Sequence, residues 1–364
     1  MRTIQSHAHP YTVEEFADVA AAVDAAREGP EPHFLVDAAV HDLFRPVLAE
    51  RLPAARLVLV EASEEAKSYG ALEPVFLDLL ARGLKRSGAL VVIGGGVLQD
   101  AGCFIASVLA RGIRWSLLPT TLLAQADSCI GSKSSINIGS FKNQLGTFYP
   151  PHRVLLVPAF LDTLPADEIR SGLGEVIKLQ LLAGEAGFRE LLADLEGFAA
   201  ADATARRELL ARWVGRSMDV KQPVIEADEF DRDRRLLLNY GHTFGHAFES
   251  VTHYGIPHGI AVVLGMLTAT HVSARLGMVP EAHAAELSRL LEPWHRPFAA
   301  RLGPVATADL LAALARDKKN TATGLTCILT RGFGRMEKVG LSAGQVAAEV
   351  LPTLARLVET GFTG

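Results

Sequence analysis

Three short segments of the 364-residue chain carry carboxylate and imidazole side chains of the kind that bind a catalytic metal ion. Glu175 lies in GLGEVIK, His242 lies in RLLLNYGHTFGH, and His258 lies in the tripeptide PHG. One carboxylate and two imidazoles suit a divalent cation such as zinc, with one coordination position left open for a substrate. These residues therefore predict a catalytic metal site.

Cationic and amide side chains accompany these candidate ligands. Lys178 is three residues from Glu175 on the same helix face, and the apolar residues around the pair predict a buried helix. His246 shares a face with His242, although HTFGH lacks the glutamate of the HExxH metalloprotease motif. A single histidine is more often a packed or capping residue than a ligand. Here, however, four polar residues recur at three- and four-residue spacing, which favours a site for an anionic, hydroxyl-rich substrate. The four residues are Arg235, Asn239, His242 and His246.

A glycine triplet, Gly94-Gly95-Gly96, follows a β-branched run and precedes a helical pattern. Glycines at this point let the backbone approach a pyrophosphate group, which the N-terminus of a helix also attracts. A tight strand-to-helix turn explains the triplet equally well, because the GxGxxG motif would need a glycine where the chain has Gln99. Asp100 would repel a phosphate, so it could instead face a carboxamide or a ribose.

A Gly/Ser-rich segment at residues 131–143 (GSKSSINIGSFKN) carries two lysines. Lys133, Asn137, Lys142 and Asn143 lie within eleven residues, which is typical of a loop that contacts an anion. A solvated surface loop has the same composition, so both interpretations stay open.

Composition and charge exclude several classes of function. The formal net charge of −5 argues against a nucleic-acid-binding protein, although a locally basic pocket can still bind an anionic substrate. The three cysteines have no CxxC spacing, which argues against disulfides and favours a reducing compartment. The N-terminal residues lack an apolar signal core, and the most apolar stretch, 89–110, is interrupted by Gln99 and Asp100. We therefore expect a cytoplasmic protein without a membrane span.

The hydrophobic pattern changes near Pro165. Before this point, short aliphatic runs alternate with helical stretches, which predicts a mostly parallel, Rossmann-like sheet covered by helices. After it, apolar residues recur at three- and four-residue spacing, as in helices. The sequence therefore predicts an α/β domain over residues 1–165 and an all-α domain over residues 166–364. The strand candidates are residues 56–60, 89–93, 115–118 and 154–157, with one further short candidate at 323–329.

Taken in order, these segments resemble the 3-dehydroquinate synthase family of sugar phosphate cyclases. The resemblance covers residues 36–335, most of the chain, and its motifs are specific in combination. It implies an N-terminal α/β domain that binds NAD and a helical C-terminal domain that carries the metal ion. The motifs are GGGVLQD, LPTTLLAQADS, GSKSSIN with FKN, TLPADEIRSGLGEVIK, LLNYGHTFGHAFE, PHG and DKK.

The resemblance also implies roles for individual residues. Glu175, His242 and His258 match the ligands of zinc or cobalt. Arg111 matches an arginine that reaches the phosphate site of the neighbouring subunit, so a homodimer is implied. The matches to cofactor contacts are Asp37, Glu64, Lys67, Gly95, Gly96, Val97, Asp100, Thr120, Thr121, Asp127, Lys133, Lys142, Phe160, Thr163 and Leu164. The matches to the substrate pocket are Asp127, Lys133, Asn143, Lys178, Lys221, Arg235, Asn239, His246 and Lys318.

The chemistry of the family explains this mixture of residues. Its members take a seven-carbon sugar phosphate, and bound NAD⁺ oxidises a ring hydroxyl to a ketone. The ketone acidifies the adjacent C–H bond, so that phosphate leaves by elimination before the hydride returns and an aldol reaction closes a carbocycle. The metal ion holds hydroxyl groups and stabilises the oxyanion, while cationic and amide groups hold the phosphate.

The substrate is less well defined than the reaction. Lys221 and Arg235 match the residues that bind the substrate carboxylate in the shikimate-pathway members, and His246 stands where many valiolone-type members have Ser-Pro. These features favour a 3-dehydroquinate synthase. However, residues 131–134 and 137–139 depart from the Gly-Gly-Lys-Thr and Asn-His-Pro of the shikimate enzymes.

Two other interpretations stay open, the first because of those departures and the second because of a shared domain plan. One is a sedoheptulose 7-phosphate cyclase that makes a 2-epi-valiolone-type cyclitol, and a further branch of the family makes deoxy-inosose from glucose 6-phosphate. The other is a metal-dependent polyol dehydrogenase, which shares the two-domain plan but would release NADH. Lys133, Lys142 and Asn143 favour a phosphate substrate and therefore argue against the dehydrogenase.

Overall fold

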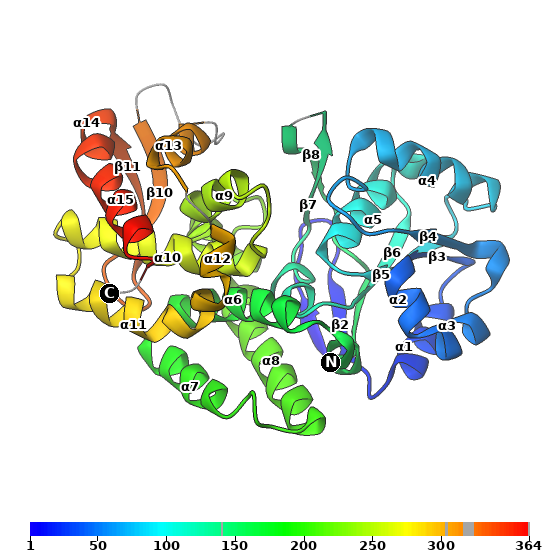
Figure 1. Ribbon diagram of the computed structural model, residues 1–364. Helices are drawn as coiled ribbons and strands as arrows, with labels where there is room; N and C mark the ends of the chain where they lie inside the picture. The colour runs from blue at the N-terminus through cyan, green and yellow to red at the C-terminus, as the bar shows by residue number, and fades with distance from the viewer. Residues whose placement is uncertain (140, 303–304, 316–323, 363–364) are drawn as a thin grey trace. The chain divides into compact units, whose positions relative to one another are not determined.

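The computed structural model describes residues 1–139, 141–302, 305–315 and 324–362 (Figure 1). Its internal contacts form two compact units. The first joins Met1–Pro165 with Ala201–Phe230, and the second joins Ala166–Ala200 with Asp231–Gly364. The domain boundaries expected from the sequence, 1–165 and 166–364, stay a prediction. A compact unit is not by itself an independently folding domain.

The first unit is built on a seven-stranded sheet in the order β1-β2-β9-β6-β5-β3-β4. All neighbouring strands are parallel except β1 and β2, which confirms the predicted mostly parallel sheet. β4, β5, β6 and β9 coincide with the four strand candidates of this region, whereas β1 to β3 were not expected. The strands are β1 (Arg2–Ile4), β2 (Tyr11–Glu15), β3 (Pro32–Asp37), β4 (Leu57–Val60), β5 (Ala89–Gly94), β6 (Arg114–Pro119) and β9 (Arg153–Leu156).

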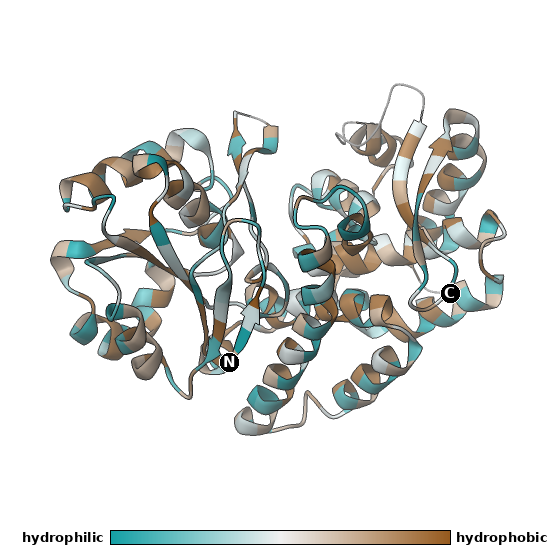
Figure 2. Ribbon diagram, turned by 180° about the vertical axis from the view of Figure 1, so that it is seen from behind, coloured by the Kyte–Doolittle hydropathy of each residue, from teal (hydrophilic) through white to brown (hydrophobic). Residues whose placement is uncertain are grey.

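Helices cover both faces of this sheet. On one face, Phe34, Val91 and Leu155 pack against apolar residues of α1 and α3 in a single buried cluster. On the other face, α5 lies against β5 and β6, and α8 packs on the turn after β6. In Figure 2 the central strands are mostly hydrophobic, while α8 alternates between both colours as a half-buried helix should. The helices are α1 (Val19–Arg27), α2 (Ala38–Leu43), α3 (Arg45–Arg51), α4 (Tyr69–Ala81), α5 (Gly96–Val108) and α8 (Ala203–Ala227).

The Gly/Ser-rich segment forms an antiparallel ribbon, β7 (Lys133–Ile138) with β8 (Phe141–Phe148), and is not the loop that its composition suggested. Ser134, Ile136 and Asn137 of β7 are buried, and the ribbon packs against α5. Its two lysines, Lys133 and Lys142, therefore lie on the strands of this packed ribbon.

The second unit is mainly helical and is centred on α10 (His258–Arg275), which is buried on nearly all sides. α9, α6 and α11 pack around it, together with β10 and α15. A helix that is apolar around its whole circumference requires such a surrounding layer. The other elements are α6 (Ala166–Ala183), α7 (Glu185–Glu196), α9 (His242–Val251), α11 (Glu281–His295), α12 (Ala299–Leu302), α13 (Thr307–Ala315), β10 (Gly324–Thr330), β11 (Met336–Ser342), α14 (Ala343–Gln345) and α15 (Leu351–Glu359).

Across the described residues, none of the helices taken singly has the length and apolar composition needed to cross a membrane. One bent pair, Glu281–Leu302 with Thr307–Ala315, meets the criterion on length and composition only.

Candidate active site

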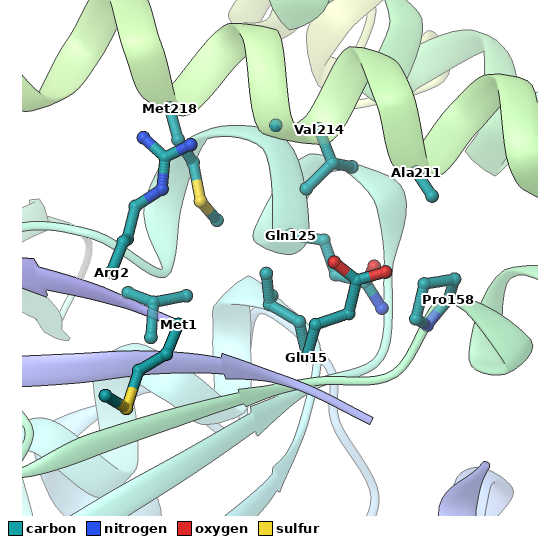
Figure 3. A pocket seen from close by; sticks show the side chains of 11 residues that line it. Met1, Arg2, Glu15, Gln125, Pro158, Ala211, Val214 and Met218 are labelled. Atoms are coloured by element: carbon teal, nitrogen blue, oxygen red, sulfur yellow. The ribbon is translucent and has the colours of Figure 1, made fainter. Parts of the chain in front are cut away.

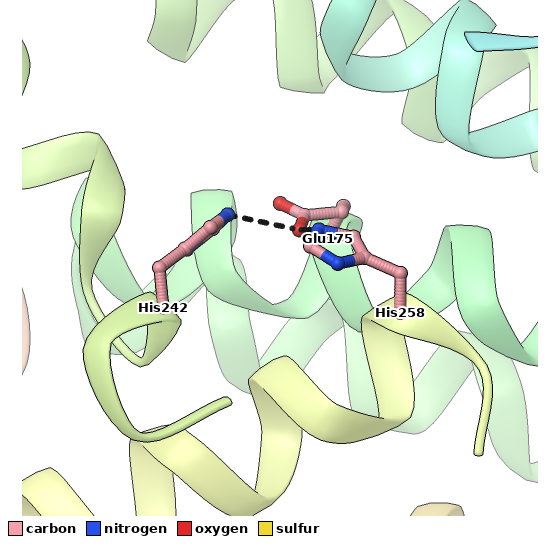
Figure 4. Close-up of side chains that lie close together, drawn as sticks. All are labelled: Glu175, His242 and His258. Atoms are coloured by element: carbon pink, nitrogen blue, oxygen red, sulfur yellow. Dashed lines mark ion pairs between the residues drawn. The ribbon is translucent and has the colours of Figure 1, made fainter. Parts of the chain in front are cut away.

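The three predicted metal ligands converge in the second unit (Figure 4). Glu175 lies in the middle of α6, whereas His242 and His258 are the first residues of α9 and α10. Glu175 Oε1 lies 3.5 Å from His242 Nε2 and 3.2 Å from His258 Nε2. Each residue offers one ligand atom, and these atoms all lie within 4.8 Å of one another. Segments far apart in the sequence thus bring one carboxylate and two imidazoles to a single point.

Glycines beside the ligands allow the supporting helices to approach this closely. A Cβ atom on Gly259, the residue after His258, would lie 1.8 Å from the carbonyl oxygen of Ser171 on α6. A Cβ atom on Gly174, the residue before Glu175, would lie 2.3 Å from the carbonyl oxygen of Gly259. The Gly259 amide also donates to Ser171 Oγ over 3.1 Å. Backbone contact between α6 and α10 therefore sets the distance between two of the ligands.

The charges around the cluster suit a bound cation. Glu175 is 1% exposed and forms an ion pair with Lys178, which is also buried. Burial acts to lower the pKa of His258, but its contacts with Glu175 and Glu249 outweigh burial and raise that pKa to about 10. Two carboxylates thus favour positive charge at the point where the ligand atoms meet. The donor set and its compact geometry fit a zinc or cobalt ion.

His246 and Glu249 lie on the same face of α9 as His242. His246, Glu249 and His258 form a second group whose potential ligand atoms also lie within 4.8 Å of one another. The rings of His246 and His242 are 5.4 Å apart between centroids. His246 was predicted from the sequence as a substrate residue, whereas Glu249 was not, although it belongs to the same motif, LLNYGHTFGHAFE.

Other predicted substrate residues of this unit lie outside the ligand cluster. Arg235 and Asn239 belong to the short 3-10 helix Arg234–Asn239, which precedes α9. Arg235 is buried, and Asn239 Nδ2 donates to the carbonyl oxygen of Leu236 over 3.1 Å. Lys318 lies outside the described residues.

The predicted cofactor residues gather at one edge of the sheet in the first unit. Asp37 ends β3, the glycine triplet joins β5 to α5, and Thr120 follows β6. These three strands are parallel neighbours, so their carboxyl ends lie side by side. Burial raises the pKa of Asp37, whose carboxylate accepts from the Ala39 amide over 2.9 Å. Gly95 is the N-cap of α5, followed by Gly96 and Val97 in its first turn, and Thr121 follows Thr120.

Lys67 links the same edge to the β7–β8 ribbon. It is 6% exposed, and its Nζ lies 3.1 Å from Asp100 Oδ2 and 3.0 Å from Asn143 Oδ1. Burial raises the pKa of Asp100, and Lys67 opposes that shift. Lys142 Nζ lies 3.4 Å from Glu64 Oε1, so the second lysine of the segment also faces a carboxylate. This polar edge with a helix N-terminus fits the pyrophosphate and ribose of a dinucleotide.

The remaining predicted residues of the first unit have varied surroundings. Lys221 Nζ lies 2.6 Å from Oδ1 of Asp127, which belongs to a π-helical turn at Ala124–Ser128.

Phe160 packs into the core against Phe44, so only its backbone is available to a ligand. Thr163 Oγ1 donates to the carbonyl oxygen of Phe160, and Leu164 caps the C-terminus of the 3-10 helix Pro158–Thr163 that contains both residues. Lys133 at the start of β7 and Arg111 before Gly112 are both exposed.

A separate cavity of about 270 Å³ lies in the first unit between the β1–β2 edge and α8 (Figure 3). Its lining includes Arg2, Glu15 and Met218. Gln125 also borders it, with Nε2 donating to the carbonyl oxygens of Pro119 and Val157. None of the predicted site residues in the described part of the chain lines this cavity.

Comparison with known proteins identifies the family. Residues 57–171 match the family model described as 3-dehydroquinate synthase N-terminal, and residues 172–320 match the one described as 3-dehydroquinate synthase C-terminal. The chain is 39% identical to the 3-dehydroquinate synthase of Rhodospirillum rubrum over 316 residues, which cover 84% of this chain and 81% of that protein.

Solved structures of two cyclases are similar over nearly the whole chain. One is 2-epi-5-epi-valiolone synthase from Streptomyces hygroscopicus subsp. jinggangensis with NAD⁺ and Zn²⁺ bound, with a TM-score of 0.81 and 27% identity over 98% of this chain and 100% of that one. The other is a 2-deoxy-scyllo-inosose synthase complexed with carbaglucose-6-phosphate, NAD⁺ and Co²⁺, with a TM-score of 0.80. It covers 96% of this chain and 99% of its own, and its 21% identity shows the fold alone. The motifs, the fold and these relatives agree, and the chain belongs to the 3-dehydroquinate synthase family, whose members are enzymes of the sugar phosphate cyclase kind.

Proposed function

We propose that this enzyme converts a seven-carbon sugar phosphate that bears a carboxylate into a carbocycle with loss of phosphate, as 3-dehydroquinate synthases do. The convergence of Glu175, His242 and His258 in a member of this family is the observation that carries the proposal. Curated relatives named 3-dehydroquinate synthase at 33–39% identity support the choice of reaction.

In this proposal, Glu175, His242 and His258 hold a zinc or cobalt ion. The bound ion supplies Lewis-acid chemistry, which polarises substrate hydroxyl groups and stabilises an oxyanion. Lys178 keeps the Glu175 carboxylate in place through their ion pair and adds a positive charge beside the ligands. Because both side chains are buried, neither can turn away without leaving an unpaired charge in the interior.

The carboxyl edge of the sheet is the proposed site of NAD, which accepts and returns a hydride when bound. The amides of Gly95, Gly96 and Val97 at the start of α5 provide donors for a pyrophosphate. Asp37 at the end of β3 provides an acceptor for ribose hydroxyls. Lys67 holds Asp100 in position at the same edge. Homodimer formation through the exposed Arg111 is part of the proposal and rests on the sequence motif alone.

Arg235 is proposed to bind the substrate carboxylate. Arg235 is buried in the 3-10 helix two residues before the metal-ligand helix α9, and Arg is suited to paired hydrogen bonds with a carboxylate. Lys221 is assigned the same function from the sequence motif. A second candidate, a sedoheptulose 7-phosphate cyclase, is favoured by the departures from the shikimate enzymes at residues 131–134 and 137–139 and by the structural similarity to valiolone synthase at 27% identity.

Side-by-side incubation with the two sugar phosphates tests the proposal. With catalytic NAD⁺ and zinc, we expect phosphate release from the carboxylate-bearing substrate of 3-dehydroquinate synthases, without net growth of nicotinamide absorbance. Accumulation of NADH without phosphate release would instead identify a polyol dehydrogenase. Phosphate release from sedoheptulose 7-phosphate alone would favour the second candidate.

A matched pair of arginine variants sharpens the substrate assignment. Arg235→Ala should reduce kcat/KM on the carboxylate substrate by about 10²-fold, since a buried charged hydrogen bond is lost. Arg234→Ala removes the same charge from the exposed neighbouring position and should change kcat/KM little. Equal losses on both sugar phosphates would remove the reason for assigning carboxylate binding to Arg235.

A further inference from the structure

His258 is placed between two carboxylates from different helices. Its Nε2 lies 3.2 Å from Glu175 Oε1 on α6, and its Nδ1 lies 3.1 Å from Glu249 Oε1 on α9. The side chain of Glu249 is only 13% exposed, so water competes weakly for this contact. The two ring nitrogens of one imidazole thus have separate anionic neighbours.

Two arrangements could explain the second carboxylate. His246, Glu249 and His258 could hold a second cation, because their potential ligand atoms lie within 4.8 Å of one another. Alternatively, Glu249 could accept the Nδ1 proton of His258 and leave Nε2 to bind the single cation beside Glu175. The first arrangement requires both nitrogens of His258 to bind metal, which a neutral imidazole with one N–H group cannot do.

The other ligand histidine supports the second arrangement. His242 Nδ1 lies 3.4 Å from the carbonyl oxygen of Tyr240, so its Nε2 is likewise the nitrogen facing Glu175. Both ligand imidazoles therefore have an acceptor on Nδ1 and present Nε2 to the same point. The acceptor of His242 is a neutral carbonyl, whereas that of His258 is a carboxylate. Metal-binding histidines commonly donate their second N–H group in this way, which fixes the tautomer and ring orientation.

The local fold keeps Glu249 in this position. Glu249 lies seven residues after His242 on α9, two helical turns along the same face. The chain then reverses through His253 and Tyr254, whose φ angles of 49° and 60° are left-handed, and reaches His258 at the start of α10. One rigid helix therefore supplies a ligand and also the residue that orients the ligand of the next helix.

We propose that Glu249 is a positioning residue that holds His258 in its Nδ1–H tautomer and aims Nε2 at one divalent cation shared with Glu175 and His242. This proposal rests on the metal site of the proposed function and adds to it the number of ions and the residue that orients one ligand. Glu249 acts through His258 and does not touch the cation. In this arrangement His246 does not bind the cation either.

Metal titration of apo-protein variants tests this assignment. Competition with a chromophoric chelator should show one Zn²⁺ per chain in the unmodified protein. Glu249→Ala should weaken Zn²⁺ binding by about 10–100-fold. Glu249→Gln keeps the size and an acceptor oxygen, and should recover part of that loss. The absorption bands of bound Co²⁺ should shift in Glu249→Ala, because the orientation of one imidazole changes.

His246→Gln separates the two arrangements. With a single ion, it should leave Zn²⁺ affinity and stoichiometry unchanged within about threefold, a change far smaller than the one expected for Glu249→Ala. Two Zn²⁺ per chain that fall to one in His246→Gln would overturn the positioning role and establish a second cation site. Unchanged affinity and an unchanged Co²⁺ spectrum in both Glu249 variants would show a merely structural residue.

Two controls keep these outcomes distinct. Circular dichroism of the apo variants identifies any folding defect, and Glu249→Gln serves as the test where Glu249→Ala does not fold. An unmodified protein that binds neither Zn²⁺ nor Co²⁺ would overturn the proposed function itself. Metal binding that does not respond to the Glu249 variants would overturn only the role of Glu249.

Discussion

The candidate metal site of the second unit and the candidate cofactor edge of the first are built in different ways. The metal ligands come from three helices, of which α6 and α10 are in backbone contact through Gly174 and Gly259. The cofactor edge is assembled from several strand-to-helix connections and a two-stranded ribbon. Its charged groups, such as Lys67 and Asp100, pair with one another. We therefore expect a single substitution at the metal site to abolish most of the metal-dependent activity. At the cofactor edge, where many polar groups contribute, we expect each substitution to reduce NAD affinity only in part.

The largest expected effect is the loss of a metal ligand. Glu175→Gln should reduce turnover by at least about 10²–10³-fold, because the cation and the oxyanion stabilisation it provides are lost. NAD affinity should stay the same, since the predicted cofactor residues belong to the first unit. Metal content, steady-state turnover and NAD titration measure the three quantities. Full activity of this variant in the presence of a chelator would show that the metal assignment is wrong.

A methyl group at the helix contact should disturb the same site without removing a ligand. Gly259→Ala should lower the free energy of unfolding by about 1–3 kcal/mol, because the new Cβ would lie 1.8 Å from the Ser171 carbonyl oxygen. Zn²⁺ affinity should fall as well, since His258 is the preceding residue. Gly197→Ala, at a position in the same unit with no atom within 4 Å of a new Cβ, is the matched control. Equal stability of the two variants in urea would mean that helix separation does not set the ligand geometry.

The cofactor edge should respond more gradually. Asp100→Asn should weaken NAD binding by about tenfold, the effect of about 1.4 kcal/mol from one charged hydrogen bond. Lys67→Met should have a similar effect, because it leaves Asp100 without its cation. The double variant should lose less than the sum of both, since the two side chains form one pair. Calorimetric NAD titration measures this coupling, and additive losses would show that the residues act separately.

The smallest expected effect on turnover comes from Glu229, a carboxylate to which no role in the metal site or the cofactor edge is assigned. Glu229 accepts from the His7 amide over 2.7 Å and from Ser6 Oγ over 2.6 Å. Burial acts to raise its pKa, but its hydrogen bonds with the His7 amide, Ser132 and Ser6 lower the pKa to about 2. A lowered folded-state pKa contributes stability that is present above the unfolded value of 4.5 and lost as the pH falls toward 2.

Glu229→Gln should therefore lower the free energy of unfolding by about 1–3 kcal/mol at pH 7 and leave turnover unchanged. The difference from the unmodified protein should shrink between pH 4.5 and about 2. Urea denaturation at several pH values measures it, with Glu208→Gln on the exposed part of α8 as the control. A stability difference that is independent of pH would show that the ionised form of Glu229 is not what matters.

Periodicity and motif order predicted much of the fold. The strands from β4 to β6, β9 and the long helices of the second unit were predicted because their apolar residues face a large core. The ribbon β7–β8 could not be predicted in this way. Its residues are mostly polar, and it is a strand pair only because β7 and β8 satisfy each other's backbone groups. β1 and β2 are short, with three and five residues, and were missed. β3 was missed although its apolar run Phe34-Leu35-Val36 is like those of the strands that were predicted.

In the candidate site, too, some residues could be predicted from their types in the sequence, whereas others could be recognised only from their neighbours in the fold. The ligands Glu175, His242 and His258 were found because their residue types are unusual in apolar surroundings. Glu249 is an ordinary acid on an amphipathic helix until α10 brings His258 to it. The glycines beside the ligands could be seen in the sequence, but their function depends on which backbone they meet.

The order of segments in the two units has a consequence for evolution and dissection of the gene. The polypeptide passes from one unit to the other after Pro165, returns at Ala201, and leaves again after Phe230. A coding sequence divided at any one of these points would separate at least one helix from the unit in which it packs. Recombination that exchanges contiguous halves between relatives should therefore yield poorly folded hybrids. The exception is a hybrid in which Ala201–Phe230, the segment that contains α8, comes from the same parent as the sheet of the first unit.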